Sequence, residues 1–146
     1  MKIYLGSDHA GFELKENMKK FLTKKNIEFE DLGNLKFQKE DDYPDYAAKV
    51  ARKVAKDKTK GILFCGSSHG MAIAANKIKG IRAVSASDVE EARKNREHND
   101  ANVLALGGWN FNEEKVEKII LTWLKTPFPE VKRHKRRVDK IKRLER

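Results

Sequence analysis

The chain has 146 residues, 39% hydrophobic and 37% charged, a composition that predicts one globular domain over residues 1–146. No run approaches the roughly 18 to 20 apolar residues of a membrane span, and there is no signal-peptide pattern. The single cysteine excludes an internal disulfide. One cysteine and four scattered histidines also exclude a structural zinc site. The net charge of +10 is concentrated in residues 132–146, which carry nine basic and two acidic side chains, so the remainder is only +3. We expect a cytoplasmic protein with no membrane partner and no metal.

Short β-rich runs alternate along the chain with longer segments of helical period. This pattern is typical of βαβ units around a mostly parallel sheet, and it predicts an α/β fold. We expect five strands, at Lys2 to Gly6, Ile27 to Glu30, Gly61 to Cys65, Arg82 to Ala86 and Asn102 to Gly107.

The segments between and after these strands predict five helices with apolar residues on one face. The second begins near Pro44, since a proline suits the first helical turn, where its missing N–H would have no partner. The five are expected at residues 14–22, from Pro44 to Val54, from His69 to Ile78, from Val89 to Arg96, and at residues 116–124.

The basic tail, about residues 129–146, follows a break at Pro127 and Pro129. Its apolar residues have helical spacing, which predicts an amphipathic helical arm. A solvated arm would not need this stripe, so we expect it to dock on its own domain or on a neighbouring subunit. The residues of the stripe are His134, Val138, Ile141 and Leu144.

Two strand ends carry the candidate chemistry, because ligands of open α/β sheets bind beyond the carboxyl ends of the strands. The first strand is followed by Asp8 and His9, and the third ends at Cys65. If these two strands are neighbours in the sheet, all three side chains converge in one crevice.

The loop after the third strand, Gly66 to Gly70, is rich in small residues and opens directly into a helix. Its backbone N–H groups and the helix dipole would form a cradle for an anion. It matches neither a P-loop nor a dinucleotide fingerprint. A tight connection without a ligand is the alternative, and His69 within it could equally face solvent.

Cys65 has two interpretations. Free cysteines are often buried and inert. A thiol at a strand end beside a helix N-terminus should instead titrate low enough to give thiolate near neutral pH, as a base or nucleophile beside amide donors.

Four residues farther along have both a functional and an ordinary interpretation. His98 and Asn99 lie between the fourth helix and the fifth strand, where they either form a polar turn that ends the helix or belong to a functional site. Arg133 and Arg137 are four residues apart, so on a helix they could clamp one phosphate or could both be solvated.

Seven segments together resemble the type B ribose-5-phosphate isomerase family, which includes galactose-6-phosphate and allose-6-phosphate isomerases. They cover essentially the whole chain and are Ser7 to Lys15, Asp42 to Ala47, Gly61 to Gly66, Ala74 to Lys77, Gly80 to Ala83, His98 to Asn102, and Arg133 to Arg137. The resemblance implies a three-layer Rossmann-like fold and a homodimer with shared active sites, or a tetramer made of two such dimers. It also implies an aldose–ketose isomerisation through an enediolate, without metal or cofactor.

The resemblance implies catalytic roles for residues of the strand-end loops. Cys65 would be the base that moves a proton between C1 and C2, and Ser67 would help to move the proton between the two oxygens. The amides from Gly66 to Gly70, including those of Ser68 and His69, would stabilise the enediolate. Asp8 and His98 would assist ring opening.

The resemblance also implies how the substrate is held. Tyr43 and Asn99 would contact the sugar, while His9, Arg133 and Arg137 would hold the phosphate. The basic arm then has a role that requires no nucleic acid.

Three positions distinguish this chain within the family. Some members lack the cysteine and use a carboxylate where this chain has Met71, so this chain resembles the cysteine type. Ser68 replaces a glycine of the loop; if the φ angle there is positive, serine costs about 1 kcal/mol. Trp109 stands where many members carry a phosphate-binding arginine, so this chain either binds the phosphate more weakly or takes a different substrate whose ring stacks on the indole.

We expect an isomerase of ribose 5-phosphate and ribulose 5-phosphate. The alternatives are an isomerase of a six-carbon sugar phosphate, a sensing module that binds a sugar phosphate without catalysis, and a nucleic-acid-binding protein whose affinity would fall steeply with salt.

Overall fold

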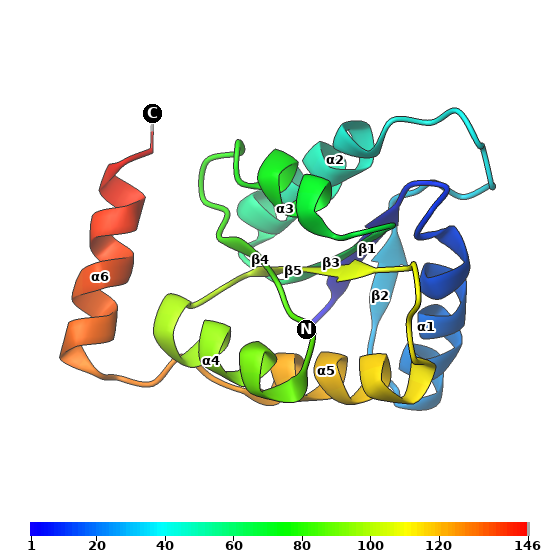
Figure 1. Ribbon diagram of the computed structural model, residues 1–146. Helices are drawn as coiled ribbons and strands as arrows, with labels where there is room; N and C mark the ends of the chain where they lie inside the picture. The colour runs from blue at the N-terminus through cyan, green and yellow to red at the C-terminus, as the bar shows by residue number, and fades with distance from the viewer. Residues whose placement is uncertain (146) are drawn as a thin grey trace.

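The computed structural model describes residues 1–145 and is built around one sheet of five parallel strands (Figure 1). The strand order is β2-β1-β3-β5-β4, so the first and third strands are neighbours, as the convergence of the two loops requires. The strands are β1 (Ile3–Ser7), β2 (Phe29–Asp31), β3 (Gly61–Cys65), β4 (Ala83–Ser85) and β5 (Val103–Gly107).

Helices cover both faces of the sheet and enclose two apolar cores. One face is covered by α1 (Phe12–Lys24), α4 (Val89–Asn99) and α5 (Glu113–Lys125), and the other by α2 (Tyr43–Asp57) and α3 (His69–Ala75) (Figure 1). β1 therefore leads to a helix on one face and β3 to a helix on the other. Their connections diverge at the carboxyl edge, which is where open α/β sheets bind ligands.

The predicted helices differ from the structure mainly at their ends. α3 ends at Ala75 rather than at Ile78, because the side chain of Asn76 pairs with both backbone groups of Ala83. α4 continues to Asn99, and Asp100 ends it in the left-handed conformation, with φ 48°. His98 and Asn99 consequently belong to the last turn of a helix, not to a turn outside it.

Hydrogen bonds of its polar residues, two of them buried, support the polar helix α4 despite its weak apolar pattern. Its N-cap Asp88 accepts a hydrogen bond from the N–H of Glu91. The indole N–H of Trp123, a core residue of α5, donates to Asn95 at 2.9 Å. Arg96 donates to the carbonyls of Thr126 and Ala101.

The basic tail forms the predicted helix, α6 (Lys132–Arg143), which packs beside α4 near the β4 edge of the sheet (Figure 1). Its stripe is only half covered: His134 and Val138 are buried, whereas Ile141 and Leu144 are 41% and 81% exposed. Among residues 1–145, no helix has the length and apolar character to cross a membrane.

Candidate active site

The β3–α3 loop brings backbone N–H groups to the thiol of Cys65. The N–H of Ser68 donates to Sγ at 3.0 Å. The amides of Met71 and Ser67 also act on this sulfur. The thiol therefore lies among main-chain donors at the carboxyl edge of the central strand, as the position of Cys65 in the sequence predicts.

Of the two interpretations of Cys65, the one that gives its thiol a low pKa differs from what the structure indicates. The residue is only 5% exposed, and burial raises the pKa of its thiol above the ordinary value. The amides of Ser68, Met71 and Ser67 act in the opposite direction, while the nearby charge of Asp8 raises the pKa further. Desolvation outweighs the donors, so the thiol is mainly protonated near neutral pH.

Ser68 adopts the strained conformation that a glycine would relieve. Its φ is 79° and its ψ is −25°, in the left-handed region that L residues other than glycine enter at a cost. Its hydroxyl lies 2.9 Å from that of Ser85, at the end of β4. This hydrogen bond fixes the residue whose N–H points to Cys65.

The β1–α1 loop places Asp8 and His9 at the same edge. Asp8 is buried, and its Oδ1 accepts the N–H of Gly11 at 3.0 Å. Burial raises the pKa of this carboxyl, although the Gly11 amide and His9 act against it. A raised pKa makes this carboxyl a stronger base than an ordinary aspartate, which suits a group that accepts and returns protons.

His9 is held by a residue that the sequence analysis did not single out. Its Nδ1 lies 2.7 Å from Oδ1 of Asp41, and its backbone N–H donates to the same oxygen at 3.1 Å. Asp41 belongs to the acidic run just before the second helix, which has no recognisable motif at that position.

Asp8, His9 and Asp41 place ligand-type atoms within 4.8 Å of one another, a spacing that could hold a metal ion. Asp8 is engaged by Gly11, and His9 by Asp41. These hydrogen bonds explain why the three side chains lie close together, and the spacing does not require a metal ion.

Two aromatic rings pack against glycines of the loop. A methyl group placed on Gly70 would lie 2.6 Å from the ring of Tyr43, so this ring rests directly on the loop. The indole of Trp109 contacts Gly66 in the same way and is 66% exposed. Both rings present surface beside the amides.

A cavity of about 910 Å³ lies beside the β3–α3 loop. Among the residues that line it are Gly66, Ser67, Ser68, His69, His98, Asn99 and Trp109. Sequence-distant candidates from α3, α4 and the β5–α5 loop are thus brought together. Asp8, His9, Tyr43, Cys65, Gly70, Arg133 and Arg137 do not line this cavity.

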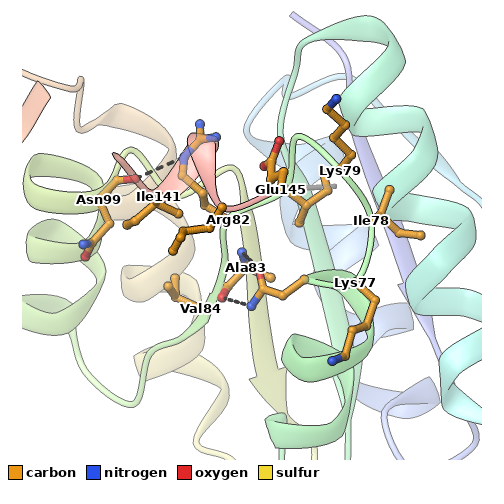
Figure 2. A pocket seen from close by; sticks show the side chains of 12 residues that line it. Lys77, Ile78, Lys79, Arg82, Ala83, Val84, Asn99, Ile141 and Glu145 are labelled. Carbon is orange, nitrogen blue, oxygen red and sulfur yellow. Dashed lines mark hydrogen bonds between the residues drawn. The ribbon is translucent and has the colours of Figure 1, made fainter. Parts of the chain in front are cut away.

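Asn99 also borders a second pocket, which lies between the end of α6 and the turn that precedes β4 (Figure 2). Figure 2 shows the Arg82 side chain reaching the Asn99 backbone, where Nε donates to the carbonyl at 3.2 Å. Arg82 also pairs with Asp100. These contacts fix the end of α4 and leave the Asn99 side chain at the cavity.

The two arginines of α6 are exposed, whereas His134 and Val138 of the same helix are buried. Neither Arg133 nor Arg137 is brought to the cavity within one chain. His134 stacks on His98, and through this contact the arm reaches the site.

Comparison with known proteins identifies the family. A family model described as Ribose/Galactose Isomerase matches residues 3–141. The chain belongs to the ribose/galactose isomerase family. The resemblance of the seven sequence segments to the type B ribose-5-phosphate isomerases is confirmed.

Relatives match over nearly their full lengths. The chain is 41% identical to ribose-5-phosphate isomerase B of Escherichia coli, with 99% of this chain and 96% of the relative covered. It is also 41% identical to the putative sugar phosphate isomerase YwlF of Bacillus subtilis, over 97% of this chain and 95% of the relative.

Solved structures of the family confirm the three-layer Rossmann-like fold. Ribose-5-phosphate isomerase B of Clostridium thermocellum superposes with a TM-score of 0.94 at 43% identity, covering 99% of this chain and 97% of that one. The Mycoplasma genitalium enzyme with bound ribulose-5-phosphate superposes with a TM-score of 0.92 at 41% identity, covering 98% and 95%.

Proposed function

We propose that this chain interconverts ribose 5-phosphate and ribulose 5-phosphate, with Cys65 as the base. The observation that carries the proposal is the Cys65 thiol at the carboxyl edge of the sheet with the N–H of Ser68 on its sulfur. Membership of an isomerase family and relatives named ribose-5-phosphate isomerase B support the choice of substrate.

The carbon chemistry uses the thiolate form of Cys65. The thiolate removes the proton from C2 of the open-chain aldose, and the electron pair left behind forms the enediolate with the C1 carbonyl. The thiol then returns the proton to C1, while Ser67 helps to move the hydroxyl proton from O2 to O1. Backbone N–H groups from Gly66 to Gly70 stabilise the negative charge that develops on oxygen. Atoms and electrons balance within the sugar, so no external oxidant or reductant is consumed.

The flanking residues open and hold the sugar. Asp8 and His98 move the protons of ring opening, a role for which an imidazole and a carboxyl of raised pKa are suited. Tyr43 and Asn99 contact the sugar hydroxyls, in keeping with a ring packed on Gly70 and a side chain at the cavity.

The phosphate is bound by His9 from the β1–α1 loop and by Arg133 and Arg137 of a second subunit. Within one chain the two arginines are exposed and away from the cavity, which favours a homodimer with shared sites. The exposed Ile141 and Leu144 would pack at that interface. A tetramer made of two dimers and a cytoplasmic location also remain our predictions.

The exposed indole of Trp109 favours one alternative, an isomerase of a six-carbon sugar phosphate. An aromatic face at the cavity can stack on a larger sugar ring.

A coupled isomerisation assay over ribose 5-phosphate, allose 6-phosphate and galactose 6-phosphate tests both assignments, with Cys65→Ser as the matched inactive control. We expect the highest kcat/KM with ribose 5-phosphate and loss of activity in the variant. A preference for a hexose phosphate would select the alternative. Turnover of none of the three, with retained binding, would identify a sensing module.

A further inference from the structure

The buried carboxylate of Asp41 binds the imidazole of His9 at its Nδ1 side. Oδ1 of Asp41 takes both the backbone N–H of His9, at 3.1 Å, and its ring Nδ1, at 2.7 Å. Oδ2 accepts from the amide of Asn34 at 3.2 Å. The Asp41 side chain is only 3% exposed, so its bonds with His9 and Asn34 replace most of its contact with water.

Asp41 is ionised in this setting. Burial raises the pKa of its carboxyl, but hydrogen bonds from the His9 ring, the Asn34 amide and the His9 backbone outweigh burial and bring the pKa below its ordinary value. A buried anion of this kind requires a donor, and the His9 ring supplies one through Nδ1.

The contact with Asp41 also determines which ring nitrogen of His9 is available. Nδ1 is occupied, whereas within residues 1–145 no protein group forms a hydrogen bond to Nε2. The side chain of His9 is 35% exposed, and Phe37 packs against the ring at an angle of 89°. Nε2 is therefore the nitrogen that can meet a ligand.

We propose that Asp41 is a positioning residue of the phosphate site, an inference that rests on the proposed function in which His9 binds the substrate phosphate. A ring protonated on both nitrogens donates to Asp41 through Nδ1 and to the phosphate through Nε2. A ring protonated only at Nδ1 would turn a lone pair toward the phosphate oxygens. Asp41 thus fixes the ring orientation and supplies the counter-charge for the imidazolium form.

The test compares Asp41→Asn with Asp45→Asn, which removes the same charge from an exposed position in the first turn of α2. The measurements are kcat and KM for ribose 5-phosphate, and the affinity for inorganic phosphate by calorimetry. We expect Asp41→Asn to raise KM and the phosphate dissociation constant by about tenfold each, the size of one charge-assisted contact, with kcat nearly unchanged. Asp45→Asn should change none of them.

A second pair of variants tests whether Asp41 acts through His9. In a His9→Ala background, Asp41→Asn should cause no further loss of phosphate affinity. An equal tenfold loss in that background would overturn the proposal, as would a fall in kcat with an unchanged dissociation constant for phosphate.

Nitrogen NMR of the histidine rings gives a measurement that requires no variant. With phosphate bound to the wild-type protein, both ring nitrogens of His9 should be protonated, and an unprotonated Nδ1 would refute the role of Asp41. The calorimetry also separates this inference from the proposed function. Loss of phosphate affinity in Asp41→Asn alone would support Asp41 even if the wild-type chain isomerised no pentose phosphate.

Discussion

The imidazole rings of His98 and His134 stack with their centroids 4.5 Å apart and an interplanar angle of 22°. This contact joins α6 to the last turn of α4, where the proposed ring-opening histidine lies. Burial lowers the pKa of His134, and the charges of Arg133, His98 and Arg137 lower it further, against an opposing effect of Glu97. The docked arm therefore favours a neutral His134.

Acidification should consequently weaken the docking of α6. Released from α4, His134 would titrate near its ordinary pKa of about 6.5 and bind more protons than when docked. Docking is then strongest above this pH and weakens as the pH falls below it. Hydrogen-exchange protection factors of α6 amides at about pH 7.5 and pH 5.5 measure the effect. His134→Phe keeps a ring and cannot titrate, so its protection should not depend on pH. Equal pH dependence in both proteins would assign the effect to another group.

The activity of the free enzyme should rise with pH through the alkaline range. Burial raises the pKa of the Cys65 thiol, while the proposed base is the thiolate. The active fraction is therefore small near neutrality and grows as the pH approaches that pKa. A profile of kcat/KM from about pH 6 to pH 10 checks this, and a maximum below pH 7 would contradict it.

Cys65→Ala should reduce kcat by about a thousandfold, within the range that general-base catalysis contributes. The substitution removes the sulfur but keeps the backbone donors, so the affinity for inorganic phosphate should change little. Steady-state kinetics and phosphate calorimetry on one preparation provide the comparison. Undiminished turnover would remove the thiolate from the mechanism.

The strain at Ser68 should appear as a stability difference between two substitutions. Ser68→Gly and Ser68→Ala both lose the hydrogen bond to Ser85, but only glycine relieves the positive φ of 79°. We expect the free energy of unfolding to be about 1 to 2 kcal/mol higher for the glycine variant than for the alanine variant. Urea denaturation measures both. Equal stabilities would mean that the loop changes conformation when the serine is removed.

The ion pair of Lys15 with Asp31 should contribute strongly to stability. Lys15 has no exposed surface, and its Nζ donates to both oxygens of Asp31 at 2.9 Å. Lys15→Ala removes the buried partner of this carboxylate, although Lys19 still donates to its Oδ2 at 2.9 Å. The loss should therefore be near the lower end of the range for a broken buried pair, about 3 kcal/mol in urea denaturation. Lys20→Ala, on an exposed position of the same helix, is the control and should cost less than about 0.5 kcal/mol.

Trp109 should report ligand binding by its fluorescence. Its indole is exposed beside the loop, whereas Trp123, the second tryptophan, is fully buried. Ribose 5-phosphate should therefore shift the emission of the wild-type protein but not of Trp109→Phe. A shift that persists in the variant would show that the ligand acts elsewhere.

The sequence was sufficient for the elements and their succession along the chain, because apolar periodicity records which face each segment buries. The order of the fourth and fifth strands in the sheet did not follow from it. The convergence of Asp8 and Cys65 also followed, since parallel strands end at one edge. The protonation of Cys65 did not follow, because the depth of burial depends on packing from both faces of the sheet. Nothing in the local sequence pattern indicates that the effect of desolvation on the thiol pKa exceeds the opposing effect of three amide donors.

Contacts between distant segments also could not be predicted from the sequence. Asp41 is 32 residues from His9 and stands in an ordinary acidic run, so no spacing rule connects them. The stacking of His98 on His134 depends on the path of the chain after Pro129, which periodicity does not describe.

Lys15 has a second consequence through the residues that it holds. Besides Asp31, its Nζ reaches the carbonyl of Asn34, and the Asn34 amide supports Asp41 behind His9. Through Asn34 and Asp41, the buried cation on α1 thus supports the imidazole that is proposed to bind the phosphate. If His9 binds the phosphate as proposed, loss of these contacts would lower the resistance to unfolding and the affinity for substrate together, and would leave the proposed proton transfer at Cys65 unchanged.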